Sequence, residues 1–114
     1  MMKKFLAVFV ASVEAYDKMK AQMKGKSPED MKAEMKKWEV WMEKHKDSIV
    51  DPGAPVGSAK RVSEGGKVED IRNTIGGYMI IQAENVDAAA KIYDDSPHFG
   101  VEGGGVEIME VVEM

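Results

Sequence analysis

The first apolar segment of the chain, residues 4–11, is hydrophobic on both sides rather than on one. In a strand, its two faces would carry Phe5, Ala7 and Phe9 and, opposite them, Leu6, Val8 and Val10. This pattern predicts a strand that is buried on both faces. The lysines before the run would also suit a signal peptide, but the run is short and Glu14 follows closely, so we favour the strand.

The longest amphipathic segment begins at Ser27. Ser27 supplies a capping hydroxyl, Pro28 suits the first helical position, and two acids follow in the first turn. Further along, one helical face carries Met31, Met35, Trp38, Met42 and His45. The spacing predicts a helix that packs methionine and tryptophan side chains on a sheet. A shorter helix is expected over residues 13–24.

Short strands and turns make up the rest of the chain. We expect a turn at residues 51–53, a second strand over 57–63, a reversal at 64–67, a third strand over 77–83, a helix over 86–94 and a last strand over 106–112. The resulting order, β-α-β-β-α-β, is typical of a ferredoxin-like α+β sandwich. Residues 1–114 are therefore predicted to form one domain, with a four-stranded antiparallel sheet and two main helices on one face.

Two helices can cover only one face of such a sheet, yet the first and third strands are apolar on both faces. An uncovered face rich in Leu, Val and Ile would be an adhesive patch on the order of several hundred Å². The simplest cover is the sheet of a second copy, which predicts a homodimer formed through the sheet face.

Composition and charge exclude several classes of protein. The chain has no cysteine, which excludes disulfides and thiolate chemistry and suits a cytoplasmic location. The net charge is −4, and the lysines of residues 18–46 alternate with acids instead of forming a basic face, so we expect no nucleic-acid partner. No apolar stretch approaches the roughly 20 residues of a membrane span, so we expect no membrane partner.

His98 and Asp95 are the candidate catalytic residues. His98 lies on a short loop before the last strand, and its imidazole could transfer protons or orient a ligand; alternatively, it binds a backbone carbonyl. Asp95 could fix the tautomer of an imidazole, or it could cap the turn that starts at Ser96.

Candidate ligand-binding residues are mostly aromatic or apolar. Met35, Trp38 and Trp41 could wall a cavity between the sheet and the first main helix, although they would serve equally well as core. Tyr78 and Asp51 are further candidates; the alternative for Asp51 is a turn-forming hydrogen bond.

Two other features bear on the site. Glu110 interrupts the apolar alternation of the last strand, which predicts either an exposed edge or bulge, or a buried carboxylate with a partner. The two histidines lack the spacing of metal ligands, and Gly103-Gly104-Gly105 enters a strand rather than a helix. We therefore expect neither a metal nor a cofactor.

With this order of elements, the chain resembles the YCII-related family of the dimeric α+β barrel group. The matching segments are Ser27-Pro28-Glu29, Gly53 to Gly57, Gly76-Gly77-Tyr78, Pro97-His98 and Val106-Glu107-Ile108. The resemblance implies a dimeric α/β barrel, and in the namesake branch it implies a histidine on the first helix acting with an aspartate at the position of Asp95. The only histidine of that helix here is His45, near its end, and residues 69–75 lack the Asp-Gly-Pro-Phe signature of many relatives.

Two functions remain open at this point. The first is a non-catalytic dimeric module that binds a small organic molecule or a partner between the sheet and the first main helix, which the missing signature favours. The alternative is a cofactor-independent enzyme that uses His98 and Asp95 for acid–base chemistry on a small organic substrate, as the related barrel group implies.

Overall fold

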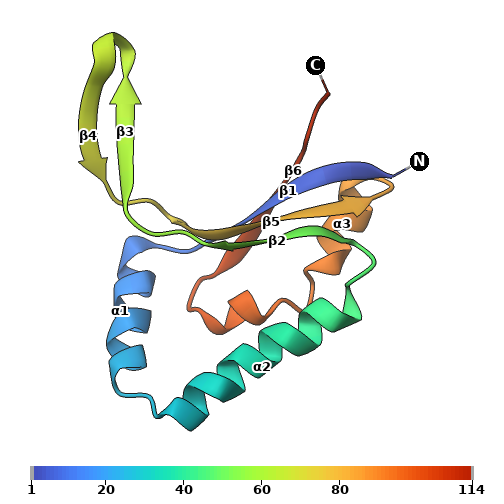
Figure 1. Cartoon of the computed structure of the whole chain (residues 1–114), viewed down its shortest axis with the longest axis horizontal. Coiled ribbons are helices and arrows are strands. Elements are labelled where there is room, and N and C mark those ends of the chain that lie inside the picture. Colours follow the sequence, from blue (N-terminus) through green and yellow to red (C-terminus); the bar gives the residue numbers. More distant parts are fainter. Residues whose placement is uncertain (1, 114) are drawn as a thin grey trace.

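The computed structural model describes residues 2–113 as an α+β fold built on a four-stranded antiparallel sheet. The strands are β1 (Lys3–Val10), β2 (Ile49–Pro55), β5 (Ile75–Ala83) and β6 (Gly105–Glu110), in the spatial order β2-β5-β1-β6 (Figure 1). The predicted four-stranded antiparallel sheet is confirmed, although β2 takes the place of the predicted strand 57–63, and β1 is an interior strand that pairs with both β5 and β6.

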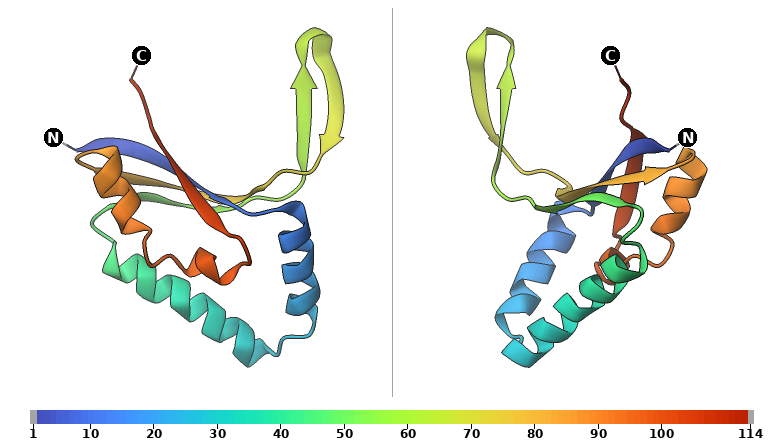
Figure 2. Two further views of the ribbon diagram at one scale, coloured as in Figure 1. Left: turned by 180° about the vertical axis from the view of Figure 1, so that it is seen from behind. Right: turned by 45° about the vertical axis from the view of Figure 1, so that its right-hand side comes forward.

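Three helices lie on one side of this sheet: α1 (Val13–Lys24), α2 (Pro28–Lys44) and α3 (Val86–Ile92) (Figures 1 and 2). Each begins where a side-chain oxygen accepts a hydrogen bond from a backbone N–H of the first turn. The capping residues are Ser12, Ser27 and Asn85. No helix within residues 2–113 is both long and apolar enough to cross a membrane.

The core fills the space between the sheet and the C-terminal half of α2. Phe5, Phe9, Met79 and Ile81 point from the sheet toward the buried side chain of Trp41 and its neighbours. Several of its aromatic rings meet edge to face, an arrangement that their quadrupoles favour; the Phe9 and Trp38 centroids, for example, are 5.3 Å apart.

The first half of α2 diverges from the sheet (Figure 1). Met35 is 63% exposed, Met31 is exposed too, and α1 buries no residue at all. The prediction that the whole methionine stripe packs on the sheet is therefore wrong for its first half. Helical periodicity defines a stripe, but it does not show how far along that stripe the sheet extends.

The opposite side of the sheet carries no helix. Leu6, Val8, Tyr78, Ile80 and Met109 lie on this side, which we call the open face. Val8 is covered by its neighbours, whereas Tyr78 and Met109 are exposed.

Strand β2 corrects the prediction for residues 51–53. The expected turn Asp51-Pro52-Gly53 lies inside this strand, and the register with β5 shifts on both sides of Asp51. Because β2 is an edge strand with local irregularities, it tolerates a proline that a central strand would not. Gly53 adopts φ +65°, and a Cβ there would lie 1.9 Å from the carbonyl oxygen of Tyr78, so only glycine fits this bulge.

The predicted second strand exists, but outside the main sheet. β3 (Ala59–Ser63) pairs with β4 (Lys67–Ile71) through a tight turn, η1 (Glu64–Gly66), in which Gly65 and Gly66 have positive φ. This hairpin rises on the side of the sheet opposite the helices (Figures 1 and 2). It forms a separate two-stranded sheet.

Candidate functional site

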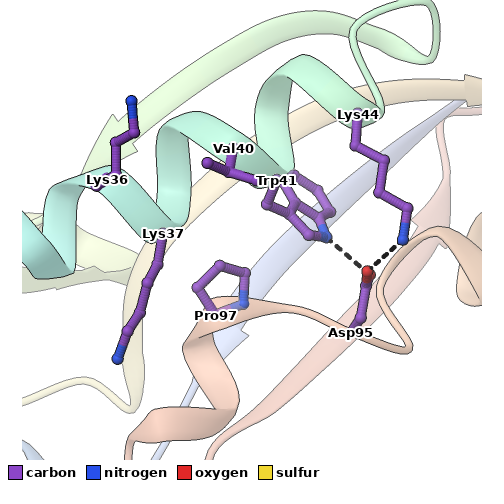
Figure 3. A pocket seen from close by; sticks show the side chains of 7 residues that line it. All are labelled: Lys36, Lys37, Val40, Trp41, Lys44, Asp95 and Pro97. Carbon is purple, nitrogen blue, oxygen red and sulfur yellow. Dashed lines mark hydrogen bonds and ion pairs between the residues drawn. The ribbon is translucent and has the colours of Figure 1, made fainter.

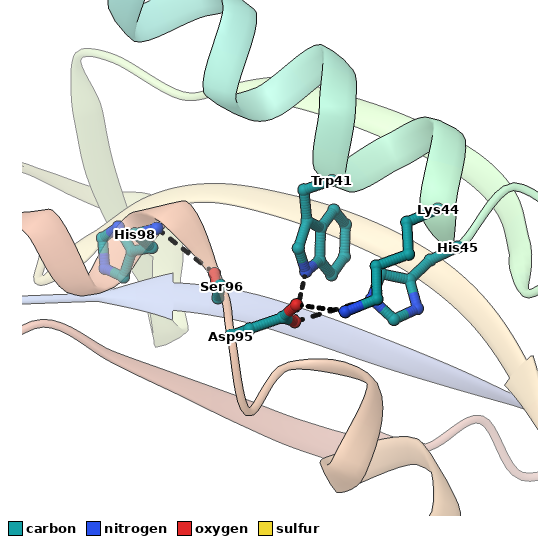
Figure 4. Close-up of polar contacts among 6 residues, drawn as sticks. All are labelled: Trp41, Lys44, His45, Asp95, Ser96 and His98. Carbon is teal, nitrogen blue, oxygen red and sulfur yellow. Dashed lines mark hydrogen bonds and ion pairs between the residues drawn. The ribbon is translucent and has the colours of Figure 1, made fainter.

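The end of α2 and the segment after α3 meet at Asp95. Its Oδ1 accepts a hydrogen bond from the indole nitrogen of Trp41 at 3.1 Å, and its Oδ2 accepts one from the Lys44 ammonium at 2.6 Å (Figure 4). His45 Nε2 lies 3.5 Å from Oδ1. The carboxylate thus ties the helix end to the loop that follows α3.

The charges in this cluster stabilise the ionised carboxylate. The hydrogen bond from Lys44 lowers the pKa of Asp95, and the bond from Trp41 adds to this effect against the opposing effect of desolvation. In return, Asp95 raises the pKa of Lys44. At neutral pH, Asp95 is therefore an anion that accepts hydrogen bonds and orients its neighbours, and it is a poor proton donor.

Two buried polar atoms around Trp41 have no hydrogen-bond partner in the described part of the chain. They are Nε2 of His45 and the hydroxyl of Tyr93, and their rings pack on the indole with centroid separations of 4.8 Å and 5.2 Å. Burial raises the pKa of Tyr93, so its hydroxyl keeps its proton. The 3.5 Å approach of His45 to Asp95 lacks hydrogen-bond geometry, so both atoms are buried without a hydrogen bond from the described part of the chain.

His98 occupies a different place. It lies on the turn η2 (Pro97–Gly100), is 7% exposed, and its Nε2 lies 2.9 Å from the carbonyl oxygen of Val10. A carbonyl only accepts, so Nε2 must carry the proton. The backbone N–H of His98 also donates to Ser96 Oγ, so this residue fastens η2 to β1.

The structure does not bring His98 and Asp95 together. Asp95 points toward α2 and away from His98, and no hydrogen bond or ion pair joins them within residues 2–113 (Figure 4). Of the two alternatives for His98, the geometry matches the bond to a backbone carbonyl. The imidazole that does approach Asp95 is that of His45.

A groove runs along the outer side of α2 next to this cluster. It has a volume of about 520 Å³ and lies between the helix and the Asp95–Pro97 segment (Figure 3). Its lining combines apolar groups with three ammonium groups and one carboxylate: Val40, Trp41, Pro97, Lys36, Lys37, Lys44 and Asp95. Since Asp95 already binds Lys44 and Trp41, the groove presents a net positive rim above an apolar floor.

The five predicted ligand-binding residues do not form one site. Trp38 and Trp41 belong to the core or its edge, and Met35 lies on the exposed half of α2. Tyr78 lies on the open face, across the sheet from Trp41. Asp51 Oδ1 accepts a hydrogen bond from Gly53 N at 2.8 Å, which is the turn-forming alternative. The expected cavity between sheet and helix is filled by aromatic side chains.

Glu110 is exposed at the end of β6 and forms an ion pair with Lys3 at 3.4 Å. This is the exposed-edge alternative for that residue. Within residues 2–113, no cluster of three or more His, Asp or Glu side chains is arranged to hold a metal ion.

Sequence reasoning missed most of the groove. Lys36, Lys37, Val40 and Lys44 recur at helical spacing, which places three cations on one face of α2 without an acid among them. This helical spacing could have indicated the cationic side of the groove from the sequence alone. Pro97 could not be paired with this face from the sequence, because the contact between α2 and η2 joins distant parts of the chain.

No protein-family model matches the chain, and no curated protein matches it either.

Proposed function

We propose that this chain is a ferredoxin-like, YCII-related homodimer that binds a small organic acid in the groove beside α2 without transforming it. The strand order β2-β5-β1-β6 and the helices on one side support the fold assignment. The uncovered apolar side chains of the open face support the dimer.

The observation that carries the ligand class is the composition of the groove. An apolar floor of Val40, Trp41 and Pro97 suits a planar or aliphatic body, and the lysine rim suits a carboxylate. Lys36 forms no ion pair among residues 2–113, so its charge is available to an anion, whereas Lys37 and Lys44 pair with Glu34 and Asp95.

Binding can be tested by thermal unfolding with matched probes. We expect benzoate and similar aromatic carboxylates to raise the melting temperature, because a ligand at 100 times its Kd stabilises by about 2.7 kcal/mol. Benzamide, which keeps the ring but not the charge, should bind more weakly. The Lys36→Gln variant should lose about threefold to tenfold in affinity for benzoate.

Lys32→Gln is the matched control, because Lys32 is an exposed lysine of the same helix that does not line the groove. Equal benzoate and benzamide affinities, or equal losses in the two lysine variants, would rule out anion recognition in the groove. A panel of carboxylates that gives no shift at all would also overturn the proposal.

A second candidate is acid–base catalysis, and the approach of His45 to Asp95 favours it. His45 is partly buried, and its Nε2 atom has no hydrogen-bond partner within residues 2–113 and lies 3.5 Å from Oδ1 of Asp95, a residue that lines the groove. If its side chain turned toward the groove, the imidazole could accept a proton from a bound ligand while Asp95 stabilises the resulting cation. The pair has the residue types of the His–Asp arrangement that the family resemblance implies, but His45 lies at the end of its helix and not near the start.

Turnover distinguishes the two candidates. Ligands found by thermal shift are incubated with the protein and analysed by mass spectrometry. An enzyme should convert one of them, His45→Gln should abolish the conversion, and His98→Gln should retain it in proportion to its folded fraction. Binding without conversion, at full affinity in His45→Gln, leaves the non-catalytic module as the function.

A further inference from the structure

The β3–β4 hairpin, residues 59–71, stands apart from the rest of the chain and is called the arm below. Its strands pair only with each other. Val62 and Val68 face each other across the arm and are 69% and 57% exposed. Because an isolated two-stranded hairpin is marginally stable in water, this arm needs support that the chain itself does not supply.

Five of the six charged groups of the arm form ion pairs within it, and Glu64, in the turn, forms none among residues 2–113. Lys60 binds Asp70 at 2.6 Å, and Glu69 lies 3.2 Å from Lys67 and 4.0 Å from Arg61. The arm therefore has no net positive charge to attract a nucleic acid or an anionic membrane, and it exposes the apolar side chains of Val62 and Val68. An apolar protein surface is the partner that this chemistry fits.

The base of the arm is fixed, so its direction is set by the fold. Arg72 forms two hydrogen bonds with Asp17 of α1, at 2.6 Å and 3.1 Å, and the Asn73 side chain accepts a hydrogen bond from the backbone of Ile75. From this base the arm rises on the side of the open face (Figures 1 and 2). A protein bound to the open face would therefore lie beside the arm.

The chain exposes more surface than a compact domain of its mass. The accessible area is 8305 Å², about 2,100 Å² more than the roughly 6,200 Å² expected of a compact monomer of this mass. The radius of gyration is 15.9 Å, against about 13 Å for a compact domain of this length. Part of this surplus lies on α1 and on the first half of α2, on the other side of the sheet, but the whole is well above the roughly 800 Å² that each partner loses in a standard interface.

We infer that the arm clasps a second copy of this chain: in the dimer, each protomer's Val62–Val68 pair packs on the flank of its partner while the two open faces meet. This inference rests on the proposed homodimer and adds the arm to its interface. A two-fold axis through the open faces makes the contact reciprocal, so one apolar pair in the sequence supplies two contacts in the assembly.

The test combines sedimentation equilibrium with limited trypsin digestion of the full chain. We expect Val62→Asp/Val68→Asp to raise the dimer dissociation constant at least about tenfold, because it places unpaired charges in an apolar contact. Val86→Asp is the control: Val86 is an exposed valine at the first position of α3, where an acid is favourable, and its dissociation constant should equal that of the parent.

Trypsin gives an independent measurement, because Arg61 and Lys67 offer cleavage sites in the arm. Cleavage there should slow as the protein concentration rises through the dissociation constant. A parent protein that sediments as a monomer overturns both the homodimer and the clasp. A parent dimer whose affinity and arm cleavage are unaffected by the double substitution overturns the clasp alone and leaves the open faces as the interface.

Discussion

The two faces of the sheet are built from the same kinds of residue, yet the chain covers only one of them. Ile80 and Ile81 are neighbours in β5; Ile81 is completely buried under the helices, whereas Ile80 is half-buried on the open face. Apolar content thus indicates that a strand is buried, but not which molecule buries it. No helix within residues 2–113 covers the open face, and this is the observation behind the proposed assembly.

The largest effect should come from charging these two neighbours separately. Ile81→Asp places an unpaired carboxylate in the core, at a cost of several kcal/mol against a total stability of about 5–15 kcal/mol, so the protein should not fold. Ile80→Asp should stay folded, with a dimer dissociation constant raised at least about 100-fold. Circular dichroism and sedimentation equilibrium measure the two outcomes.

If Ile80→Asp and Ile81→Asp have the same effect on folding, the two faces of the sheet do not differ in the way described above. If Ile80→Asp also unfolds, the open face is essential to the protomer itself. If it dimerises like the parent, the proposed interface lies elsewhere.

A second test concerns the covered face, where Trp41 links α2 to the sheet. Trp41→Ala should lower the free energy of unfolding by about 3–5 kcal/mol, because it leaves a large cavity and removes the hydrogen bond to Asp95. Val40→Ala, at the exposed neighbour in the same helix, should change it by less than about 0.5 kcal/mol. Urea denaturation checks both values, and comparable losses would show that the groove side of α2 is packed as tightly as its core side.

His98 tests whether an imidazole on the covered side is structural. His98→Ala should cost about 1–3 kcal/mol in unfolding free energy, because the carbonyl of Val10 loses its buried donor. His98→Gln, which offers an amide N–H in its place, should recover part of the loss. An unchanged stability in both variants would mean that the ring does not fasten η2 to β1.

The smallest effect is the pH dependence of the Asp95 contact. Because the folded protein lowers the pKa of Asp95 below its ordinary value of 3.8, the carboxylate stabilises the fold above that pH. This stabilisation should disappear as the pH falls through the folded-state pKa. Melting temperatures of the parent and Asp95→Asn should therefore differ at neutral pH and converge in acid.

Asp94→Asn is the matched control, since Asp94 forms no ion pair within residues 2–113. A difference between the parent and Asp95→Asn that persists unchanged in strong acid would show that the hydrogen bond from Trp41, and not the charge, carries the effect.

Local patterns predicted the elements well. The capping signals at Ser27 and the double-sided apolar run of residues 4–11 define α2 and β1 correctly, because helix starts and central strands depend on residues close in the sequence. The prediction failed at residues 51–53, where proline and glycine indicate a turn in isolation but form a bulged edge strand in the fold. Whether a strand lies at the edge depends on how all strands of the sheet pair, and the residues of that strand alone do not show it.

The candidate site was harder to predict for the same reason. His98 and Asp95 are close in sequence, but the short segment between them turns their side chains in different directions. Asp95 instead meets Lys44 and Trp41, about fifty residues earlier in the chain. Such long-range contacts follow from the path of α2 across the sheet, which periodicity does not give.

Strand β2 has a consequence for how copies of this chain can join. Pro52 and Pro55 have no backbone N–H, and the shifted register beside Gly53 breaks the ladder that an incoming strand would need. Growth of the sheet sideways into open-ended fibrils is therefore blocked at this border. This border therefore favours association through the open face, as in the proposed dimer, over pairing of one sheet edge with another.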